Sequence, residues 1–165
     1  MLKNKKRICC LLKTVDFSRT SHVQVLTQGS INGYNRLFGG KLMEWIDIVA
    51  AVVARRHCEK NVTTAVVDTL QFKGAAYPND TIVLDGYITY VGKTSMEVCV
   101  KTYVEALSGE KHLLNTAYVV MVALDENEKP TKVPPLRLIS DEEEYEWMLA
   151  EKRCALRKKR RIENY

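Results

Sequence analysis

One segment constrains the fold of this chain more than any other: the apolar run that starts at Gly39-Gly40 and ends at Cys58. Its apolar residues occur on every side of the helix that the run predicts, and such a helix is normally buried all round. One carboxylate, Asp47, lies in the middle of the run, with Glu44 one turn earlier. Because an ionised carboxylate is costly to bury without a partner, we expect Asp47 to have a specific local purpose.

The remainder of the chain predicts an antiparallel sheet wrapped around this helix. Residues 95–106 alternate apolar and more polar side chains, which is typical of a strand with one buried face. Further strands are predicted at 21–27, 63–72, 81–91 and 113–124, after a loosely ordered lead-in at residues 1–20. The combination is an α+β architecture. Since one helix cannot cover both faces of such a sheet, we expect a second subunit.

A second helix is predicted at about residues 140–160, on the outside of the domain. Ser140 and Glu143 have the spacing of a capping box. Acidic residues at the start of this helix and basic residues at its end match the helix dipole. We therefore expect a single domain over residues 1–165, with its core at about 15–136.

Composition excludes several classes of protein. The chain has 165 residues, 46% of them hydrophobic, and a net charge of +5 with the excess of basic residues at 3–7 and 152–161. Because the centre is balanced, we expect no nucleic-acid partner. No apolar segment is long enough to cross a bilayer, so we expect no membrane partner and a cytoplasmic location. The five cysteines lack zinc-type spacing and are predicted to be reduced thiols that bind no metal: Cys9, Cys10, Cys58, Cys99 and Cys154.

Three features carry possible chemistry. Asp47 could be a general base or a nucleophile, unless an arginine such as Arg36 or Arg55 simply pairs with it. Free N–H groups at Gly39-Gly40 could polarise a thioester or ester carbonyl, although the helix places them roughly 10 Å from Asp47. Asn32 or Asn35, in the preceding loop, could orient a water molecule, and spacing alone does not choose between them.

The sequence from Asn32 to His57, NGYNRLFGGKLMEWIDIVAAVVARRH, resembles the signature of hotdog-fold acyl-CoA thioesterases. It is most similar to the cytosolic acyl-CoA hydrolase group, which includes the brain-type enzyme and short bacterial relatives. Agreement continues at Val67-Asp68, at Thr116-Ala117, and over residues 91–98 and 133–136. The resemblance covers roughly residues 15–150.

This resemblance implies a long helix wrapped by a curved antiparallel sheet, paired into dimers and often into trimers of dimers. The implied reaction is hydrolysis of acyl-CoA to a free acid and CoA, with no separate cofactor. Asp47 would activate water, Asn32 from the opposite subunit would position it, and an N–H of Gly39 or Gly40 would polarise the thioester carbonyl. Phe38 departs from the pattern, because some members have histidine there.

CoA carries several phosphate charges, so basic and hydroxyl groups near the cleft should matter. The positions expected to bind it are Arg56, His57, Lys93, Thr94 and Ser95. We expect the basic C-terminal segment to be a solvated helix end instead.

Two alternatives to a thioesterase are a non-catalytic acyl-CoA-binding module and an acyl-chain hydratase or dehydratase. The latter would need a catalytic histidine, which the loop before the helix lacks.

Overall fold

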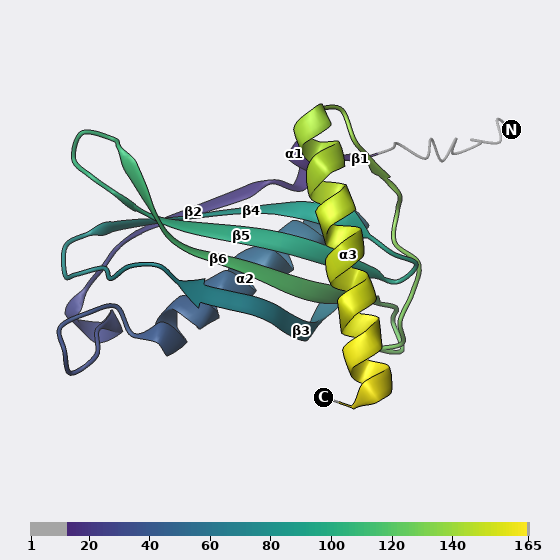
Figure 1. The fold of residues 1–165 in the computed structure, drawn as a ribbon, viewed down its shortest axis with the longest axis horizontal. Helices are drawn as coiled ribbons and strands as arrows, with labels where there is room; N and C mark the ends of the chain where they lie inside the picture. The colour runs from purple at the N-terminus through teal and green to yellow at the C-terminus, as the bar shows by residue number, and fades with distance from the viewer. Residues whose placement is uncertain (1–12, 165) are drawn as a thin grey trace, which may run out of the picture.

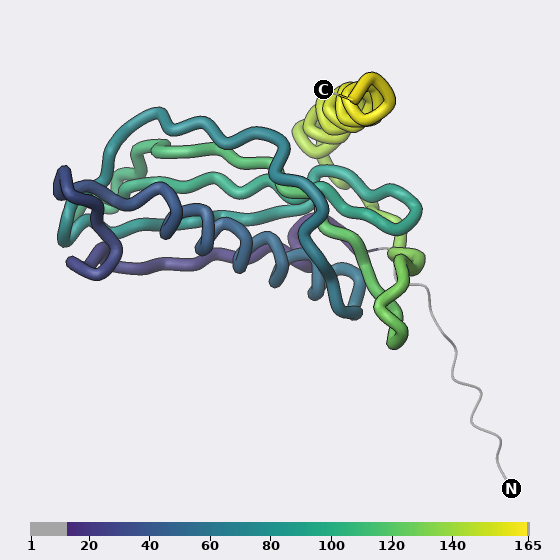
Figure 2. The backbone as a smooth tube through the Cα atoms, turned by 90° about the horizontal axis from the view of Figure 1, so that it is seen from below, coloured from purple at the N-terminus to yellow at the C-terminus, as the bar shows by residue number. Residues whose placement is uncertain are grey.

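The computed structural model describes residues 13–164, in which a five-stranded antiparallel sheet has a long helix on each face (Figures 1 and 2). Helix α2 (Gly39–Cys58) lies along one face, and α3 (Asp141–Glu163) crosses the opposite face. The predicted central helix and the five predicted strands are all present. In spatial order the strands are β2 (Thr20–Val25), β4 (Thr81–Val91), β5 (Ser95–Glu105), β6 (Lys111–Leu124) and β3 (Asn61–Phe72).

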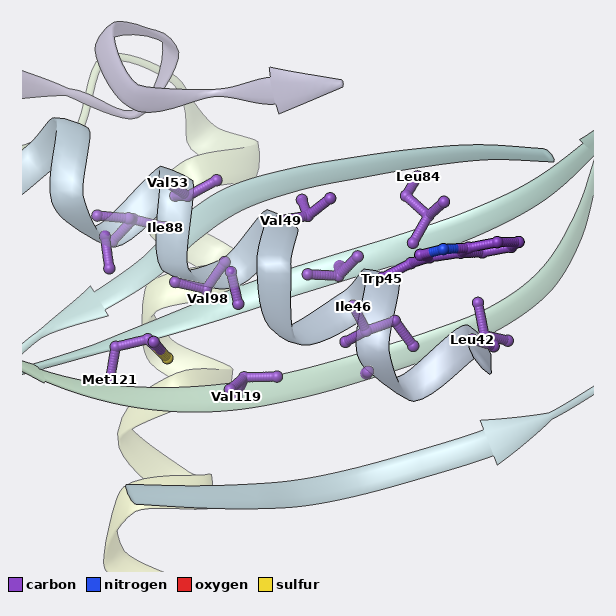
Figure 3. Packing of buried hydrophobic residues seen from close by; sticks show 14 of the residues in the cluster. Leu42, Trp45, Ile46, Val49, Val53, Leu84, Ile88, Val98, Val119 and Met121 are labelled. Carbon is purple, nitrogen blue, oxygen red and sulfur yellow. The ribbon is translucent and has the colours of Figure 1, made fainter. Parts of the chain in front are cut away.

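The core fills the space between α2 and the concave face of the sheet (Figure 3). Gly86 on β4 is the point of closest approach, since a Cβ there would lie 2.5 Å from a methyl carbon of Val49. Burial of this apolar surface is the main stabilising contribution to the fold. The side chains that meet here are Leu42, Trp45, Ile46, Val49 and Val53 of α2, and Leu84, Ile88, Val98, Val119 and Met121 of the strands.

The expectation that α2 is buried on every side is wrong for the single chain. Met43 is 44% exposed and Ile48 is 51% exposed, and Asp47 between them is also exposed. The sheet meets only one side of the helix, so the other side stays open unless another molecule covers it. The all-round apolar pattern therefore describes one face packed on the sheet and one face left uncovered.

Part of the predicted lead-in is also wrong, because residues 13–20 are ordered. They form β1 (Lys13–Thr14), α1 (Val15–Ser18) and the start of β2, and β1 pairs in parallel with β7 (Leu136–Arg137). Lys13 is the reason: its Nζ donates to the backbone oxygen of His57 at 2.7 Å and to the carboxylate of Glu59 at 2.8 Å. A cation there satisfies carbonyl groups at the negative end of α2. Cys9, Cys10 and the basic residues 3–7 lie outside the described residues.

Helix α3 begins as predicted. The N–H of Glu143 donates to the hydroxyl of Ser140 at 3.3 Å, and the Glu143 carboxylate accepts from the N–H of Ile139 at 2.7 Å. No helix within residues 13–164 is both long and apolar enough to cross a membrane.

The basic half of α3 is not simply solvated, which corrects the expectation for that segment. Three arginines on one face of the helix pair with two buried carboxylates on the sheet, Glu97 and Asp68. Arg153 donates to Glu97 at 2.8 Å and Arg160 to Asp68 at 2.7 Å, while Arg157 contacts both. These arginines recur at helical spacing, so one face of α3 presents all of them to the sheet.

Candidate active site

A groove of ≈ 320 Å³ runs between α2 and the edge strand β3, and we refer to it as the α2–β3 groove. Positions 40, 43, 44 and 47 lie on one side of a helix because of its 3.6-residue period. The groove therefore extends from the start of α2 to Asp47, which remain roughly 10 Å apart along the helix. Its lining residues are Gly40, Met43, Glu44, Ile46, Asp47, Val67, Leu70 and Val119.

Asp47 is held by a threonine that the sequence did not single out. The hydroxyl of Thr64 on β3 donates to Oδ1 of Asp47 at 2.6 Å. A bulge in β3 follows directly, between Thr64 and Val66. Thr63 and Thr64 are adjacent and point to opposite faces of a strand, so sequence alone could not tell which hydroxyl meets the helix.

Neither arginine proposed as a structural partner pairs with Asp47. In the described part of the chain Asp47 forms no salt bridge, whereas its neighbour Glu44 pairs with Lys41 at 2.7 Å. The guanidinium of Arg36 lies over the ring of Tyr77 instead. Asp47 is thus the carboxylate of the groove that is free of a cation and oriented by a hydrogen bond.

The start of α2 offers two N–H groups to a ligand. The N–H groups of Lys41 and Leu42 donate to the carbonyl of Phe38, but those of Gly39 and Gly40 have no acceptor within residues 13–164. A Cβ at Gly40 would lie 2.6 Å from the ring of Phe38, so a larger residue there would require that exposed ring to move. Donors of this kind at a helix N-terminus can stabilise negative charge on an oxygen.

Asn32 is not brought to Asp47 within the single chain. It does not line the α2–β3 groove, and its Oδ1 accepts the N–H groups of Tyr34 at 2.9 Å and Arg36 at 3.3 Å. Its amide nitrogen has no partner among the residues described. Asn35, the other candidate, takes a left-handed turn conformation with φ of 56°. Pairing of Asn32 with Asp47 across two subunits remains a prediction.

The five positions expected to bind CoA do not form one site. Arg56 donates to the carbonyl of Arg19 and to the hydroxyl of Thr20, at the β2 edge of the sheet. His57 is fully buried, and its Nε2 donates to the carbonyl of Pro134 at 3.0 Å. Burial also lowers the pKa of His57. Its place in the core argues against the predicted role for His57 in binding CoA.

The other three positions lie near the turn between β4 and β5. Lys93 lines a small pocket with Trp147, whereas Thr94 and Ser95 line a separate groove beside α3. No group of three or more His, Cys, Asp or Glu residues that could hold a metal ion occurs in the described part of the chain.

Comparisons with known proteins identify the family of this chain. Residues 34–107 match the sequence model of the Thioesterase superfamily. The uncharacterized acyl-CoA thioester hydrolase YkhA of Bacillus subtilis is 40% identical over 139 residues, which cover 84% of this chain and 76% of that protein. The acyl-CoA hydrolase of Staphylococcus aureus, solved with butyryl coenzyme A, coenzyme A and coenzyme A disulfide, superposes with a TM-score of 0.88. It is 31% identical, over 92% of this chain and 93% of that one.

An apo-hexameric acyl-CoA thioesterase superposes with a TM-score of 0.85 at 36% identity, over 89% of this chain and 95% of that one. A long helix cradled by an antiparallel sheet, matched by these solved structures, is the hotdog fold of thioesterases. The chain belongs to the acyl-CoA thioester hydrolases of the Thioesterase superfamily. Variants of the staphylococcal hydrolase with one asparagine, one aspartate or one threonine replaced by alanine have also been solved.

Proposed function

We propose that this chain hydrolyses acyl-CoA to a free acid and CoA, with Asp47 as the general base. The observation that carries the proposal is the α2–β3 groove, a mostly apolar groove that is lined by both Gly40 and Asp47. An acyl chain can lie on the apolar wall while its thioester carbonyl faces the helix start. The chemistry then needs only water as the second reactant.

In the proposed reaction, Asp47 accepts a proton from a water molecule as that water attacks the thioester carbonyl. The carbonyl oxygen becomes negative and is stabilised by the N–H of Gly39 or Gly40. Collapse of the tetrahedral intermediate breaks the C–S bond, and the CoA thiolate takes the proton from Asp47. Thr64 keeps one carboxylate oxygen engaged, so the other is directed at the water.

Asn32 of a second copy is proposed to position the attacking water. Its amide nitrogen is available, and the open face of α2 and the exposed Val66 and Val67 of edge strand β3 need a covering partner. The three residues replaced in the staphylococcal variants have the same separations along that chain as Asn32, Asp47 and Thr64 have here. Because a related thioesterase is hexameric, we extend the proposal to a trimer of dimers.

Thr94 and Ser95 remain proposed contacts of CoA. Lys93 and Arg56 lie apart from them, Lys93 in the pocket beside Trp147 and Arg56 at the β2 edge of the sheet.

The cytoplasm remains the proposed compartment. It is supported by the free thiols of Cys58, Cys99 and Cys154, which are typical of proteins kept in a reducing environment.

The first test is thiol release from a panel of acyl-CoAs, from acetyl to palmitoyl, by the wild-type chain and by Asp47→Asn. Loss of a general base should lower kcat by roughly 10²- to 10⁴-fold. CoA release by Asp47→Asn at the wild-type rate would show that Asp47 is not the base. It would leave the acyl-CoA-binding module or a different catalytic group as the explanation of the groove.

A second test asks whether the site is shared between subunits. Asn32→Ala and Asp47→Ala chains are each inactive by the proposal, but a mixed dimer contains one site in which both residues are wild type. After subunits exchange at random, the mixture should recover about a quarter of wild-type activity. If the two residues act within one chain, mixing restores nothing.

A further inference from the structure

Helix α3 is the outermost element on the face of the sheet opposite α2, and it stands on that face as a ridge (Figure 2). Its inner side packs on the sheet through Ala150 and the arginines that pair with Asp68 and Glu97. Its outer side presents large apolar side chains that stay exposed within residues 13–164. These are Tyr145, Met148, Leu156 and Ile162.

The four exposed apolar residues lie within roughly a third of the helix circumference, because their spacing follows the 3.6-residue period. We refer to them as the α3 stripe. The outer side of a surface helix is normally polar, and an apolar stripe there indicates contact with another molecule.

The charges of α3 are segregated along its length. Every charged residue from Asp141 to Glu151 is acidic, and every charged residue from Lys152 to Arg161 is basic. The helix dipole favours acids in the first turn and bases in the last, so it does not account for the middle of the helix. Within residues 13–164, Glu151 and Lys152 form no salt bridge. Their charges are therefore available to another molecule.

A second copy of α3 that runs antiparallel fits both the stripe and the charges. A two-fold axis places the acidic half of each helix against the basic half of the other, whereas a parallel pair places like charges together. With the axis between Glu151 and Lys152, these two residues face each other across the pair, and Glu144 lies opposite Lys159. All four side chains border the α3 stripe, so the two stripes meet between the charged pairs.

The stripe and the charges contribute differently to such a contact. Burial of apolar surface supplies the attraction. Exposed ion pairs each contribute little, but like charges placed opposite each other disfavour the parallel arrangement and the wrong register. The segregated charges therefore specify the antiparallel direction.

We propose that α3 is a self-association surface, through which two dimers join by an antiparallel pair of α3 helices. The partner is a second copy of this chain. The α3 stripe lies on the opposite side of the sheet from the exposed face of α2, which the proposed dimer covers, so one chain can make both contacts at once. Two different two-fold contacts on each chain can close a ring of dimers. The inference extends the proposed function, because it names the surface that assembles the dimers.

The test is charge reversal on α3, followed by the mass of the assembly from light scattering during size-exclusion chromatography. Glu144→Lys/Glu151→Lys and Lys152→Glu/Lys159→Glu each place like charges opposite each other, and each should reduce the assembly to the dimer. The chain that carries all four substitutions should regain the wild-type mass, because both sides of every pair are then reversed.

Glu126→Lys/Glu128→Lys is the matched control for the acidic half. It makes the same change of charge at exposed positions outside α3 and should keep the wild-type mass. Met148→Ser/Leu156→Ser removes apolar contact from the α3 stripe without changing any charge, and it should also give dimers. This variant decides the proposal if a charge-reversed helix does not fold.

Three results would each overturn the proposal. They are a wild-type chain no larger than a dimer, a reversal or serine variant that keeps the wild-type mass, and a four-residue variant that stays dimeric. The mass does not depend on thioester cleavage. An assembled wild-type chain with the expected variant masses that cleaves no thioester would refute the proposed hydrolysis and would still support the α3 contact.

Discussion

Replacing Thr64 with valine should slow thioester hydrolysis without unfolding the chain. Valine keeps the β-branched shape of threonine but removes the hydroxyl that donates to Asp47 at 2.6 Å. A hydrogen bond to a charged group contributes about 1.5–3 kcal/mol. If the whole of that orienting contribution is felt in the transition state, kcat falls roughly 10- to 150-fold, since each ~1.4 kcal/mol is tenfold. Thiol release at saturating acyl-CoA measures kcat directly.

Thr63→Val is the matched control, because it makes the same change one residue away, where no hydrogen bond to Asp47 exists. It should leave kcat within about twofold of wild type, as expected for a surface substitution. The reasoning is refuted if Thr64→Val retains wild-type kcat, or if both valine variants lose activity equally. Urea denaturation of both variants shows whether any loss comes from unfolding.

Three further predictions concern stability. Because burial lowers the folded-state pKa of His57 below its ordinary value of 6.5, the folded chain binds fewer protons than the unfolded chain as the pH falls below 6.5. This makes wild-type stability fall on acidification by up to ~1.4 kcal/mol per pH unit, and His57→Gln should lack this part of the loss when urea unfolding is followed against pH. Gly86→Ala should destabilise the fold by about 1–3 kcal/mol, because the new methyl would lie 2.5 Å from a valine methyl of α2, whereas Gly33→Ala meets open space and should change the urea midpoint little. Arg157→Leu breaks two buried ion pairs and should cost about 3 kcal/mol in urea unfolding; an equal cost for Lys159→Leu, whose own ion pair is exposed, would contradict this.

The main elements of the fold were predictable because their signals are local. The apolar run of α2 and the alternation along β5 specify helix and strand within a dozen residues. Ser140 and Glu143 marked the start of α3 for the same reason, since helix caps depend on residues a few positions apart. Cys58 and Cys99, predicted as reduced thiols, are free and buried in the structure.

Errors arose where one residue acts across a long stretch of sequence. Lys13 was interpreted as part of a basic lead-in, yet it binds the end of α2. The backbone oxygen that it contacts belongs to His57, 44 residues further along the chain. His57 has the sequence context of a helix-end cation, and only the packing of Pro134 against it reveals a core residue. Arg153, Arg157 and Arg160 resemble a charged tail until the sheet supplies Glu97 and Asp68 as partners.

The candidate site could be described in part from the sequence. Asp47 and Gly40 were singled out because a carboxylate in an apolar helix and glycines at a helix start are unusual in themselves, and both line the α2–β3 groove. Thr64 could not be found, since a threonine in a strand is common and its meaning comes from the hydrogen bond to Asp47. Asn32 was assigned by family resemblance, and its proposed partner belongs to a second copy of the chain.

Lys13 also bears on where a minimal hydrolase of this kind can begin. The superfamily match starts at residue 34, after β1, α1 and β2. A chain trimmed to that boundary would lose edge strand β2, which pairs with β4. It would also lose the Lys13 ammonium group that binds the backbone oxygens of Arg56 and His57. The carbonyl end of the helix that carries Asp47 would then be open to water. The start of the superfamily match is therefore not the start of the folding unit, because the smallest chain expected to stay folded begins some twenty residues earlier, near Lys13.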